Sequence, residues 1–324
     1  MAQKIWMNMS REKVQLDEFE RSLRDDGFDL RIRFVDDEDE QTILEMGNWA
    51  DAVISGLEHW NAERLAAVSG NLKFLLRFGT GVDTIDIPAA TREGIVVANI
   101  PGANAVAVAE SALLHMLNLG RKLSTECYLP GRAWQEASIG TELGGKTVGI
   151  IGFGNIGKHL ARMLHGFGAR ILTYDPIAQI DEEKYGVRAV DSYEDILKNC
   201  DIVSLHVPLT PETQCMINAR TLRMMKPTAL LINTCRGGVV EEEALLEALQ
   251  KGVIAGAGLD VLNVEPGNPN SCLLGAPNAV ISAHIGGRTQ ESVDRSLEML
   301  RNGVRDFFSG QIPFHTLNPE LYRR

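Results

Sequence analysis

Three side chains in the C-terminal half of the chain have types and positions that suit carbonyl chemistry. Arg236, Glu265 and His284 each follow a short apolar run with the composition of a buried strand. Because the carboxyl ends of parallel strands meet at one edge of a sheet, we expect the three side chains to lie in one region. An arginine, an acid and a histidine together suit the reduction of a 2-keto acid by a hydride donor, or the reverse oxidation.

Each of the three residues would have a separate task. Arg236 would bind the substrate carboxylate with its fork of donors and polarise the carbonyl. Protonated His284 would give its proton to the carbonyl oxygen, and in the opposite direction the neutral ring would take it back. Glu265 would hold the second ring N–H and favour the protonated imidazole near neutral pH. Taken singly they could be a surface arginine, a solvated turn and a core histidine, so the interpretation depends on the three together.

A glycine-rich turn indicates a dinucleotide site. The segment GFGNIG (152–157) follows the apolar run VGII and precedes a helix-like stretch. Gly152 would permit a tight turn, Gly154 would let a pyrophosphate approach the backbone, and Gly157 would allow helix and strand to pack closely. The first amides of the helix, from Asn155 and Ile156 onward, would face the phosphates. An accidental glycine pattern in an ordinary βαβ unit is the alternative.

The acid at the end of the next strand-like run indicates which dinucleotide is bound. Asp175 closes the run ILTYD and would accept hydrogen bonds from the adenosine ribose hydroxyls. A 2′-phosphate there would meet a negative charge, and the following Pro176-Ile177 supplies no arginine. The sequence therefore predicts NAD rather than NADP. A methyltransferase could use a similar turn and acid, but the arginine, acid and histidine argue against that class.

The elements that must position these residues alternate along the chain. We expect strands at Leu30–Val35, Ala52–Ser55, Leu72–Arg77 and Val96–Ala98, and a long buried helix over Ala103–Leu123. Strand, turn and helix then alternate from KTVGIIGFG to NAVISAH. Their continuous apolar runs are typical of strands buried on both faces. The pattern predicts an α/β protein with doubly wound parallel sheets.

Length and composition predict a globular protein of two domains. The 324 residues exceed what one hydrophobic core usually supports, and 44% hydrophobic with 23% charged residues is an ordinary balance. The net charge of −11 argues against a nucleic-acid partner, which needs a basic surface. The acidic run Asp36–Glu40 could hold a cation, but a solvated loop is the more ordinary interpretation, and we predict no metal site.

The cysteines and the apolar runs indicate the compartment. The five cysteines form no CxxC pair, which suits reduced thiols in the cytoplasm. The first residues lack the apolar core of a signal peptide, and no apolar run reaches the roughly 20 residues of a membrane helix. We therefore expect a cytoplasmic protein with no membrane partner. The cysteines are Cys127, Cys200, Cys215, Cys235 and Cys272.

Taken in order, these segments resemble the D-isomer-specific 2-hydroxyacid dehydrogenase family, which includes phosphoglycerate dehydrogenases and hydroxypyruvate and glyoxylate reductases. The resemblance covers nearly the whole chain. Its marks are GIIGFGNIG with Asp175, HVPLTPETQCMIN (206–218), INTCRGGVVEEEAL (232–245), GLDVLNVEP (258–266) and SAHIGG (282–287).

The resemblance implies two Rossmann-like domains. A flavodoxin-like substrate domain would comprise residues 1–100 and 288–324, an NAD-binding domain would comprise 101–287, and the active site would lie between them. It implies a homodimer joined through the cofactor domain. It places Arg77, Gly79 and Thr80 with Arg236 at the substrate carboxylate. Beyond the glycine-rich turn and Asp175, it assigns to the cofactor Tyr174, Pro176, His206, Val207, Pro208, Thr213, Thr234, Cys235, Arg236, Asp260, His284 and Gly286.

Four segments bear on the substrate. The segments RFGTGVD (77–83) and HIGG (284–287) most resemble phosphoglycerate dehydrogenases. However, Ile54–Leu57 and Gln135–Ser138 stand where those enzymes carry basic residues, and a phosphate without basic partners would be held poorly. We therefore expect hydroxypyruvate or glyoxylate at least as readily as 3-phosphohydroxypyruvate.

Two other functions share the architecture. In the pattern typical of formate dehydrogenases, glutamine stands at the position of Glu265. The glutamate therefore argues against a formate dehydrogenase. A non-catalytic NAD(H)-sensing scaffold, as in the family's transcriptional co-repressors, keeps the same three residues, and these residues do not separate it from an enzyme. The HIGG segment, where co-repressors have bulky aromatic residues, favours the enzyme.

Overall fold

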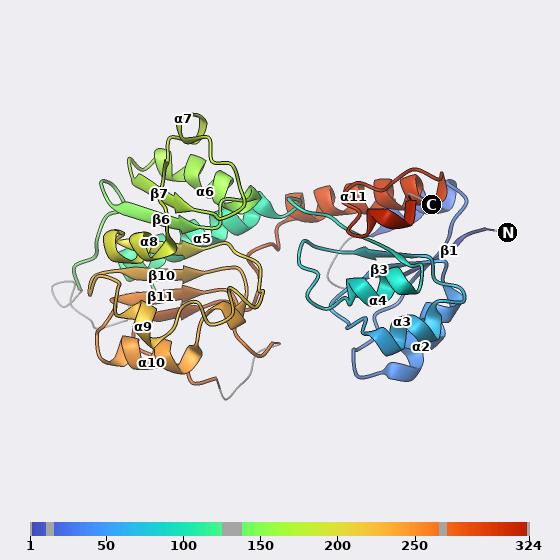
Figure 1. The fold of residues 1–324 in the computed structure, drawn as a ribbon, viewed down its shortest axis with the longest axis horizontal. Coiled ribbons are helices and arrows are strands. Elements are labelled where there is room, and N and C mark those ends of the chain that lie inside the picture. Colours follow the sequence, from blue (N-terminus) through green and yellow to red (C-terminus); the bar gives the residue numbers. More distant parts are fainter. Residues whose placement is uncertain (1, 11–15, 125–137, 266–270, 323–324) are drawn as a thin grey trace, which may run out of the picture. The chain divides into compact units, whose positions relative to one another are not determined.

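The computed structural model describes residues 2–10, 16–124, 138–265 and 271–322 (Figure 1). The chain divides into two compact units, one formed by Met1–Asn104 with Thr289–Arg324 and the other by Ala105–Arg288. Both units are built on sheets in which every strand pair is parallel. The predicted α/β class is therefore confirmed.

The first unit contains a five-stranded sheet in the order β2-β1-β3-β4-β5, which is the order of flavodoxin-like sheets. Helices follow the strands, and one long C-terminal helix returns to pack on the same unit. The strands are β1 (Lys4–Met7), β2 (Asp29–Ile32), β3 (Ala52–Ser55), β4 (Phe74–Arg77) and β5 (Val96–Asn99). The helices are α1 (Asp17–Asp25), α2 (Glu40–Trp49), α3 (Ala62–Val68), α4 (Ile87–Arg92), α11 (Gln290–Phe308) and the 3₁₀ turn η4 (Pro319–Tyr322).

Both faces of the first sheet are covered by helices, which explains its apolar strands. Successive strand residues point to opposite faces, so Ile5 and Met7 join one buried cluster and Trp6 joins the other. Helices α1 and α11 cover the first cluster, where Phe74 stacks on Phe307 at 4.5 Å between ring centres. Helices α2, α3 and α4 cover the second cluster. Polar groups for binding or catalysis are therefore expected in the loops at the carboxyl ends of the strands.

The second unit contains a seven-stranded sheet in the order β12-β11-β10-β9-β6-β7-β8. The strands are β6 (Thr147–Ile151), β7 (Arg170–Tyr174), β8 (Arg188–Ala189), β9 (Ile202–Leu205), β10 (Leu230–Asn233), β11 (Gly256–Leu259) and β12 (Ala279–Ile281). The helices are α5 (Ala105–Arg121), α6 (Asn155–His165), α7 (Glu182–Tyr185), α8 (Tyr193–Asn199), α9 (Ala219–Leu222), α10 (Glu242–Gln250) and the 3₁₀ turn η3 (Gly237–Val239).

The strand order reverses between β6 and β9, and this reversal locates the site. After β6 the chain builds β7 and β8 on one side, and it then returns to build β9 to β12 on the other side. The connections on the two sides of β6 diverge at such a point, and a crevice opens beyond the carboxyl ends of the strands. Helices α5 and α6 cover one face of the sheet, and α8, α9 and α10 cover the other (Figure 1).

Most of the expected elements are present in the structure. Strand Ala52–Ser55 is confirmed, and the expected long helix is present as Ala105–Arg121. The other three expected strands are present with shifted ends. Strand β1 was missed, because three apolar residues after a lysine and beside a polar segment do not distinguish a strand from a loop. Strand β1 pairs with β2 on one side and with β3 on the other, so it joins these two strands in the sheet.

Two carboxylates of the acidic run Asp36–Glu40 form ion pairs with the side chain of Arg64. The buried guanidinium of Arg64 lies 2.5 Å from Asp37 and donates to Glu40 at 2.7 Å. Burial alone would raise the pKa of Asp37, but the His59 amide and Arg64 lower it to about 2.

Among the described residues, no group of three His, Cys, Asp or Glu side chains could hold a metal ion. No described helix combines the length and apolarity needed to span a bilayer.

Candidate active site

The glycine-rich turn connects β6 to α6 at the point where the strand order reverses. Gly152 has a φ of +94°, and a Cβ atom there would lie closer than 3 Å to the carbonyl oxygen of His206. Gly157 faces back onto the same turn, since an added Cβ would lie 2.5 Å from the carbonyl oxygen of Gly152. Both positions therefore require glycine for the fold of the turn itself.

Gly154 differs from the other two glycines. It precedes the first residue of α6 with a φ of −76°, and an added Cβ would meet no atom within 4 Å. No side chain caps this helix end, so its first amides have no intrahelical or capping partner. An open space in front of uncapped helix amides is suited to the phosphates of a dinucleotide. The turn thus fits the predicted cofactor.

Asp175 connects the end of β7 to the glycine-rich turn. Its Oδ2 accepts from the amide of Phe153 at 2.8 Å, and its Oδ1 accepts from the amides of Ile177 and Ala178 at 2.9 Å each. Burial alone would raise the pKa of Asp175, but these amides and the charge of Lys158 lower it. The carboxylate is therefore an anion. Its Oδ2 retains a lone pair for one further hydroxyl donor, as the ribose of NAD would supply.

Two polar side chains at the ends of β9 and β10 have buried atoms without partners. His206 Nε2 lies 2.9 Å from Ser204 Oγ, whereas its Nδ1 and Thr234 Oγ1 have no hydrogen-bond partner in the described chain. Buried polar atoms are seldom left in this state, so a bound molecule is expected beside them. Burial lowers the pKa of His206 to about 4, which keeps the ring neutral and unsuited to act as an acid near pH 7.

Glu265 and His284, two of the predicted catalytic residues, are in direct contact. Glu265 Oε2 lies 2.5 Å from His284 Nδ1, and Glu265 Oε1 accepts from the amide of Leu262 at 3.1 Å. Burial alone would raise the pKa of Glu265, but His284, the Leu262 amide and the charge of Arg236 lower it overall. The His284 side chain is 45% exposed, and its Nε2 has no partner in the described chain. Nε2 is therefore available to a substrate.

The backbone at His284 is held in an unusual conformation. Its φ is +51°, in the left-handed region that residues other than glycine seldom adopt. Asp260 holds it there, because its carbonyl accepts from the His284 amide at 2.8 Å and its carboxylate accepts from the amides of Ile285 at 3.0 Å and Gly286 at 2.7 Å. An added Cβ on Gly286 would lie 2.7 Å from that carboxylate. Asp260 is 2% exposed and binds this loop within the protein.

Arg236 lies directly after β10 on the same edge. Its guanidinium donates to the carbonyl of Cys235 at 2.8 Å, and its own carbonyl accepts from Asn233 Nδ2 at 2.9 Å. Its charge acts on Glu265, as the lowered pKa of that carboxyl indicates. Burial raises the pKa of the neighbouring Cys235 thiol to about 11, so this thiol is not a nucleophile. The three predicted catalytic residues therefore share one edge of the sheet in the second unit.

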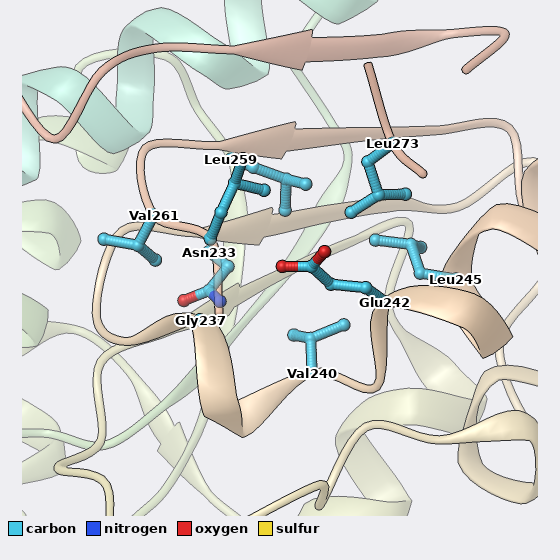
Figure 2. A pocket seen from close by; sticks show the side chains of 9 residues that line it. Asn233, Gly237, Val240, Glu242, Leu245, Leu259, Val261 and Leu273 are labelled. Carbon is cyan, nitrogen blue, oxygen red and sulfur yellow. The ribbon is translucent and has the colours of Figure 1, made fainter. Parts of the chain in front are cut away.

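A small hollow is lined by Val261 and Leu262, which belong to the segment that leads to Glu265. The contacts of this segment with α10 were not predicted from the sequence. Figure 2 shows the Glu242 carboxylate pointing into the hollow from the start of α10, among the side chains of Leu245, Leu259 and Leu273. Glu242 accepts from the amide of Asn263 at 2.6 Å and from Ser271 Oγ at 3.2 Å. The hollow is lined mainly by aliphatic side chains, so we assign it to the support of the site and not to the substrate.

The predicted substrate loop lies in the first unit, after β4. Arg77 is 8% exposed and donates to the carbonyls of Phe78 at 2.7 Å and Gly81 at 3.1 Å, so its guanidinium shapes the loop from below. Gly79 has a φ of +138°, and Asn99 Nδ2 donates to the carbonyl of Thr80 at 2.7 Å. The amides of Thr80 and Gly81 have no hydrogen-bond partner in the described chain. They are the donors that this loop can offer to a carboxylate.

The remaining predicted positions are distributed around the same strand ends. Ile156 lies in the first turn of α6, and Tyr174 ends β7 with Pro176 just beyond it. Val207 and Pro208 follow β9, where Thr213 Oγ1 donates to the carbonyl of Pro208 at 2.6 Å. Three parts of the sequence-based prediction lie outside the described residues, namely Cys127, Gln135–Ala137 and Pro266.

Fold and site together define a class of protein. A parallel sheet with a glycine-rich turn and an acid at its switch point binds a dinucleotide. At the same edge, Arg236 is a cation suited to a carboxylate, and His284 beside Glu265 is suited to proton transfer. This combination defines a two-domain, dinucleotide-dependent oxidoreductase.

Comparison with known proteins identifies the family. Residues 113–286, more than half of the chain, match the model of the D-isomer specific 2-hydroxyacid dehydrogenase NAD binding domain. A glyoxylate reductase of Thermococcus litoralis is 37% identical over 289 residues, 86% of this chain and 87% of that protein. A D-3-phosphoglycerate dehydrogenase of Synechocystis sp. is 40% identical over 251 residues, 76% of this chain and 45% of that longer protein.

A solved structure agrees with these relatives. The D-lactate dehydrogenase of Aquifex aeolicus, in complex with NAD and lactic acid, superposes with a TM-score of 0.85 at 29% identity, over 97% of this chain and 98% of that chain. The chain belongs to the D-isomer specific 2-hydroxyacid dehydrogenase family. It is an NAD-dependent oxidoreductase that acts on the CH–OH group of 2-hydroxy acids, and the predicted family, cofactor and reaction class are confirmed.

The glycine-rich turn yields a paired test. Gly154→Ala adds a methyl group where only solvent or cofactor can lie, so it should weaken NADH binding at least about tenfold and leave Tm within about 2 °C of wild type. Gly157→Ala forces a methyl group against the turn and should cost about 1–3 kcal/mol of unfolding free energy. Fluorescence titration with NADH and thermal melts measure the two effects. Equal loss of stability in both variants would contradict the assignment of Gly154 to cofactor approach.

Proposed function

We propose that the protein reduces a small unphosphorylated 2-keto acid, hydroxypyruvate or glyoxylate, with NADH. The observation that carries the chemistry is the 2.5 Å contact between Glu265 and His284, in which Nδ1 is held by a carboxylate and Nε2 is open. A histidine held in this way has one nitrogen fixed in orientation and the other free to exchange a proton with a bound molecule.

The chain's residues divide the reaction as follows. Arg236 binds the carboxylate of the keto acid and polarises its carbonyl. His284 donates the proton on Nε2 to the carbonyl oxygen, so that an O–H bond forms while the N–H bond breaks. Bound NADH supplies the hydride to the carbonyl carbon. Glu265 remains an anion and stabilises the protonated ring before transfer, and the exposed ring regains its proton from solvent.

The first unit supports the choice of an unphosphorylated substrate. In the segment Ile54–Leu57 at the end of β3, Ile54 and Ser55 are buried, and the exposed side chain is Leu57, at 74% exposure. An added Cβ on Gly56 would lie 2.7 Å from the carbonyl oxygen of Asn8, so the backbone here is tightly packed. No charged side chain of this segment can meet a phosphate dianion. The resemblance to a glyoxylate reductase over most of both chains supports the same substrate class.

We further propose how the two units divide the work. The second unit, with the glycine-rich turn, Asp175, His206, Thr234 and the strand-end residues predicted from sequence, would bind NAD. The first unit would hold the substrate through the amides of Thr80 and Gly81. This division corresponds to a substrate domain near 1–100 and 288–324 and a cofactor domain near 101–287. We also propose a homodimer in the cytoplasm, and the four described cysteines, all free thiols, are compatible with a reducing compartment.

Replacement of the proton donor tests the proposed chemistry. His284→Ala should lower kcat for hydroxypyruvate reduction by about 10²–10⁴, the usual contribution of a general acid. NADH affinity should remain near the wild-type value because Nε2 points to the substrate. His165→Ala, an exposed histidine of α6, is the matched control. Near-wild-type turnover in His284→Ala would remove His284 from the mechanism.

A substrate panel tests the substrate class and the principal alternative. We expect NADH oxidation with hydroxypyruvate or glyoxylate at a kcat/KM at least equal to that with 3-phosphohydroxypyruvate. A strong preference for the phosphorylated acid would contradict the proposal. Tight NADH binding with no turnover on any 2-keto acid would favour an NAD(H)-sensing scaffold.

Asp175 provides a test of cofactor choice. Asp175→Asn removes the charge and retains an acceptor for the amide of Phe153, so the preference for NADH over NADPH should fall about tenfold or more. The control is Asp181→Asn, which alters an exposed N-cap of α7. The ratio of kcat/KM values for the two cofactors is the measurement. An unchanged ratio would show that another residue selects against the 2′-phosphate.

A further inference from the structure

We propose that His115, a buried histidine of α5, is a positioning residue for the loop that carries His284. It acts through the hydroxyl of Ser282. The inference deepens the proposed function, since it concerns the residue to which proton transfer was assigned above. Its evidence is a continuous chain of hydrogen bonds that starts at His115 in α5 and ends at the amides of Ile285 and Gly286, the two residues after His284.

The chain of contacts joins three separate elements of the second unit. His115 is 4% exposed, and its Nε2 lies 3.1 Å from Ser282 Oγ, just after β12. Ser282 Oγ donates to Asp260 Oδ1 at 2.5 Å, just after β11. The Asp260 carboxylate in turn accepts from the amides of Ile285 and Gly286, and its backbone carbonyl accepts from the amide of His284. The helix is therefore linked to the catalytic loop through two side chains.

The direction of each hydrogen bond follows from the number of protons. Asp260 accepts from two backbone amides and can only accept from Ser282, so the single hydroxyl proton is directed to the carboxylate. Ser282 Oγ must then accept from His115, which places a proton on Nε2. Burial lowers the pKa of His115 more than the charge of Asp260 raises it, so the ring is neutral. Its Nδ1 is buried without a partner in the described chain.

The loop at the end of this chain needs support. His284 has a φ of +51°, and a residue other than glycine is strained in that region. The side-chain bonds of Asp260 keep the loop in this conformation. Loss of the His115 donor would let the Ser282 hydroxyl turn from the carboxylate, and Asp260 would then have one fixed partner fewer.

The packing around His115 limits where its ring can lie. An added Cβ on Gly258 of β11 would lie 2.7 Å from the Cβ atom of His115, so α5 lies directly against the strand at this point. A histidine that only filled this space could be replaced by any side chain of similar volume. A positioning histidine can be replaced only by a side chain that donates from the same place. Leucine and glutamine separate the two cases, because glutamine carries a terminal N–H.

The experiment compares His115→Leu with His115→Gln. For His115→Leu we expect kcat for hydroxypyruvate reduction to fall about tenfold, with a much smaller change in KM. Amide hydrogen exchange in the peptide that contains Ile285 and Gly286 should become faster. For His115→Gln we expect kcat within about threefold of wild type and protected exchange. His165→Leu, which changes an exposed histidine of α6, is the matched control.

A double-mutant cycle tests the same link at a second residue, so the result does not depend on whether one variant folds poorly. Ser282→Ala breaks the same link from the other side, so it should reproduce the kinetic and exchange effects of His115→Leu. The double variant should be no slower than the slower single variant. Additive losses in the cycle would overturn the proposal, as would equal effects of leucine and glutamine at position 115.

Hydrogen exchange separates this inference from the proposed function. If the wild-type protein reduces no 2-keto acid, the proposed function fails, but the exchange of the loop can still be compared among the variants. Faster exchange in His115→Leu and not in His115→Gln would then support the positioning role alone. Unchanged exchange in His115→Leu would overturn the positioning role whatever the catalytic result.

Discussion

The hydrogen bond between Glu265 and His284 is the interaction on which the proposed chemistry depends. At 2.5 Å it fixes Nδ1 and leaves Nε2 open, and the neighbouring charges keep the carboxyl ionised. The pair needs two segments of chain to meet. Glu242 holds the Glu265 segment from α10, and Asp260 holds the strained backbone at His284. Much of the polar structure at this edge of the sheet therefore supports the orientation of one ring.

The cofactor site depends on a different constraint, namely close approach of backbone to backbone. Gly152 and Gly157 pack against the chain itself, whereas Gly154 faces open space beside uncapped helix amides. Asp175 fastens the turn through the amide of Phe153 and still has acceptor capacity. Because β6 and β9 adjoin at the switch point, this turn and the neutral His206 lie at adjacent strand ends. The fold brings cofactor and catalytic groups to one edge.

The sequence predicted the residues whose roles follow from their place after a strand. Arg236, Glu265 and His284 could be found in this way, because parallel strands end together. Residues that act across elements could not be found. The sequence analysis did not single out Glu242 or His115, because their partners are distant in the sequence. Arg77 was expected at the substrate, yet its guanidinium binds carbonyls of its own loop.

The dependence of kcat/KM on pH in Glu265→Gln tests the central claim most directly. The Glu265 carboxylate lies 2.5 Å from the His284 ring, and glutamine removes its negative charge, so the basic limb for hydroxypyruvate reduction should move to lower pH. We predict a displacement of about one pH unit or more, which corresponds to ~1.4 kcal/mol. A profile that keeps the wild-type limb and differs only in height would contradict the claim that Glu265 controls the proton on His284.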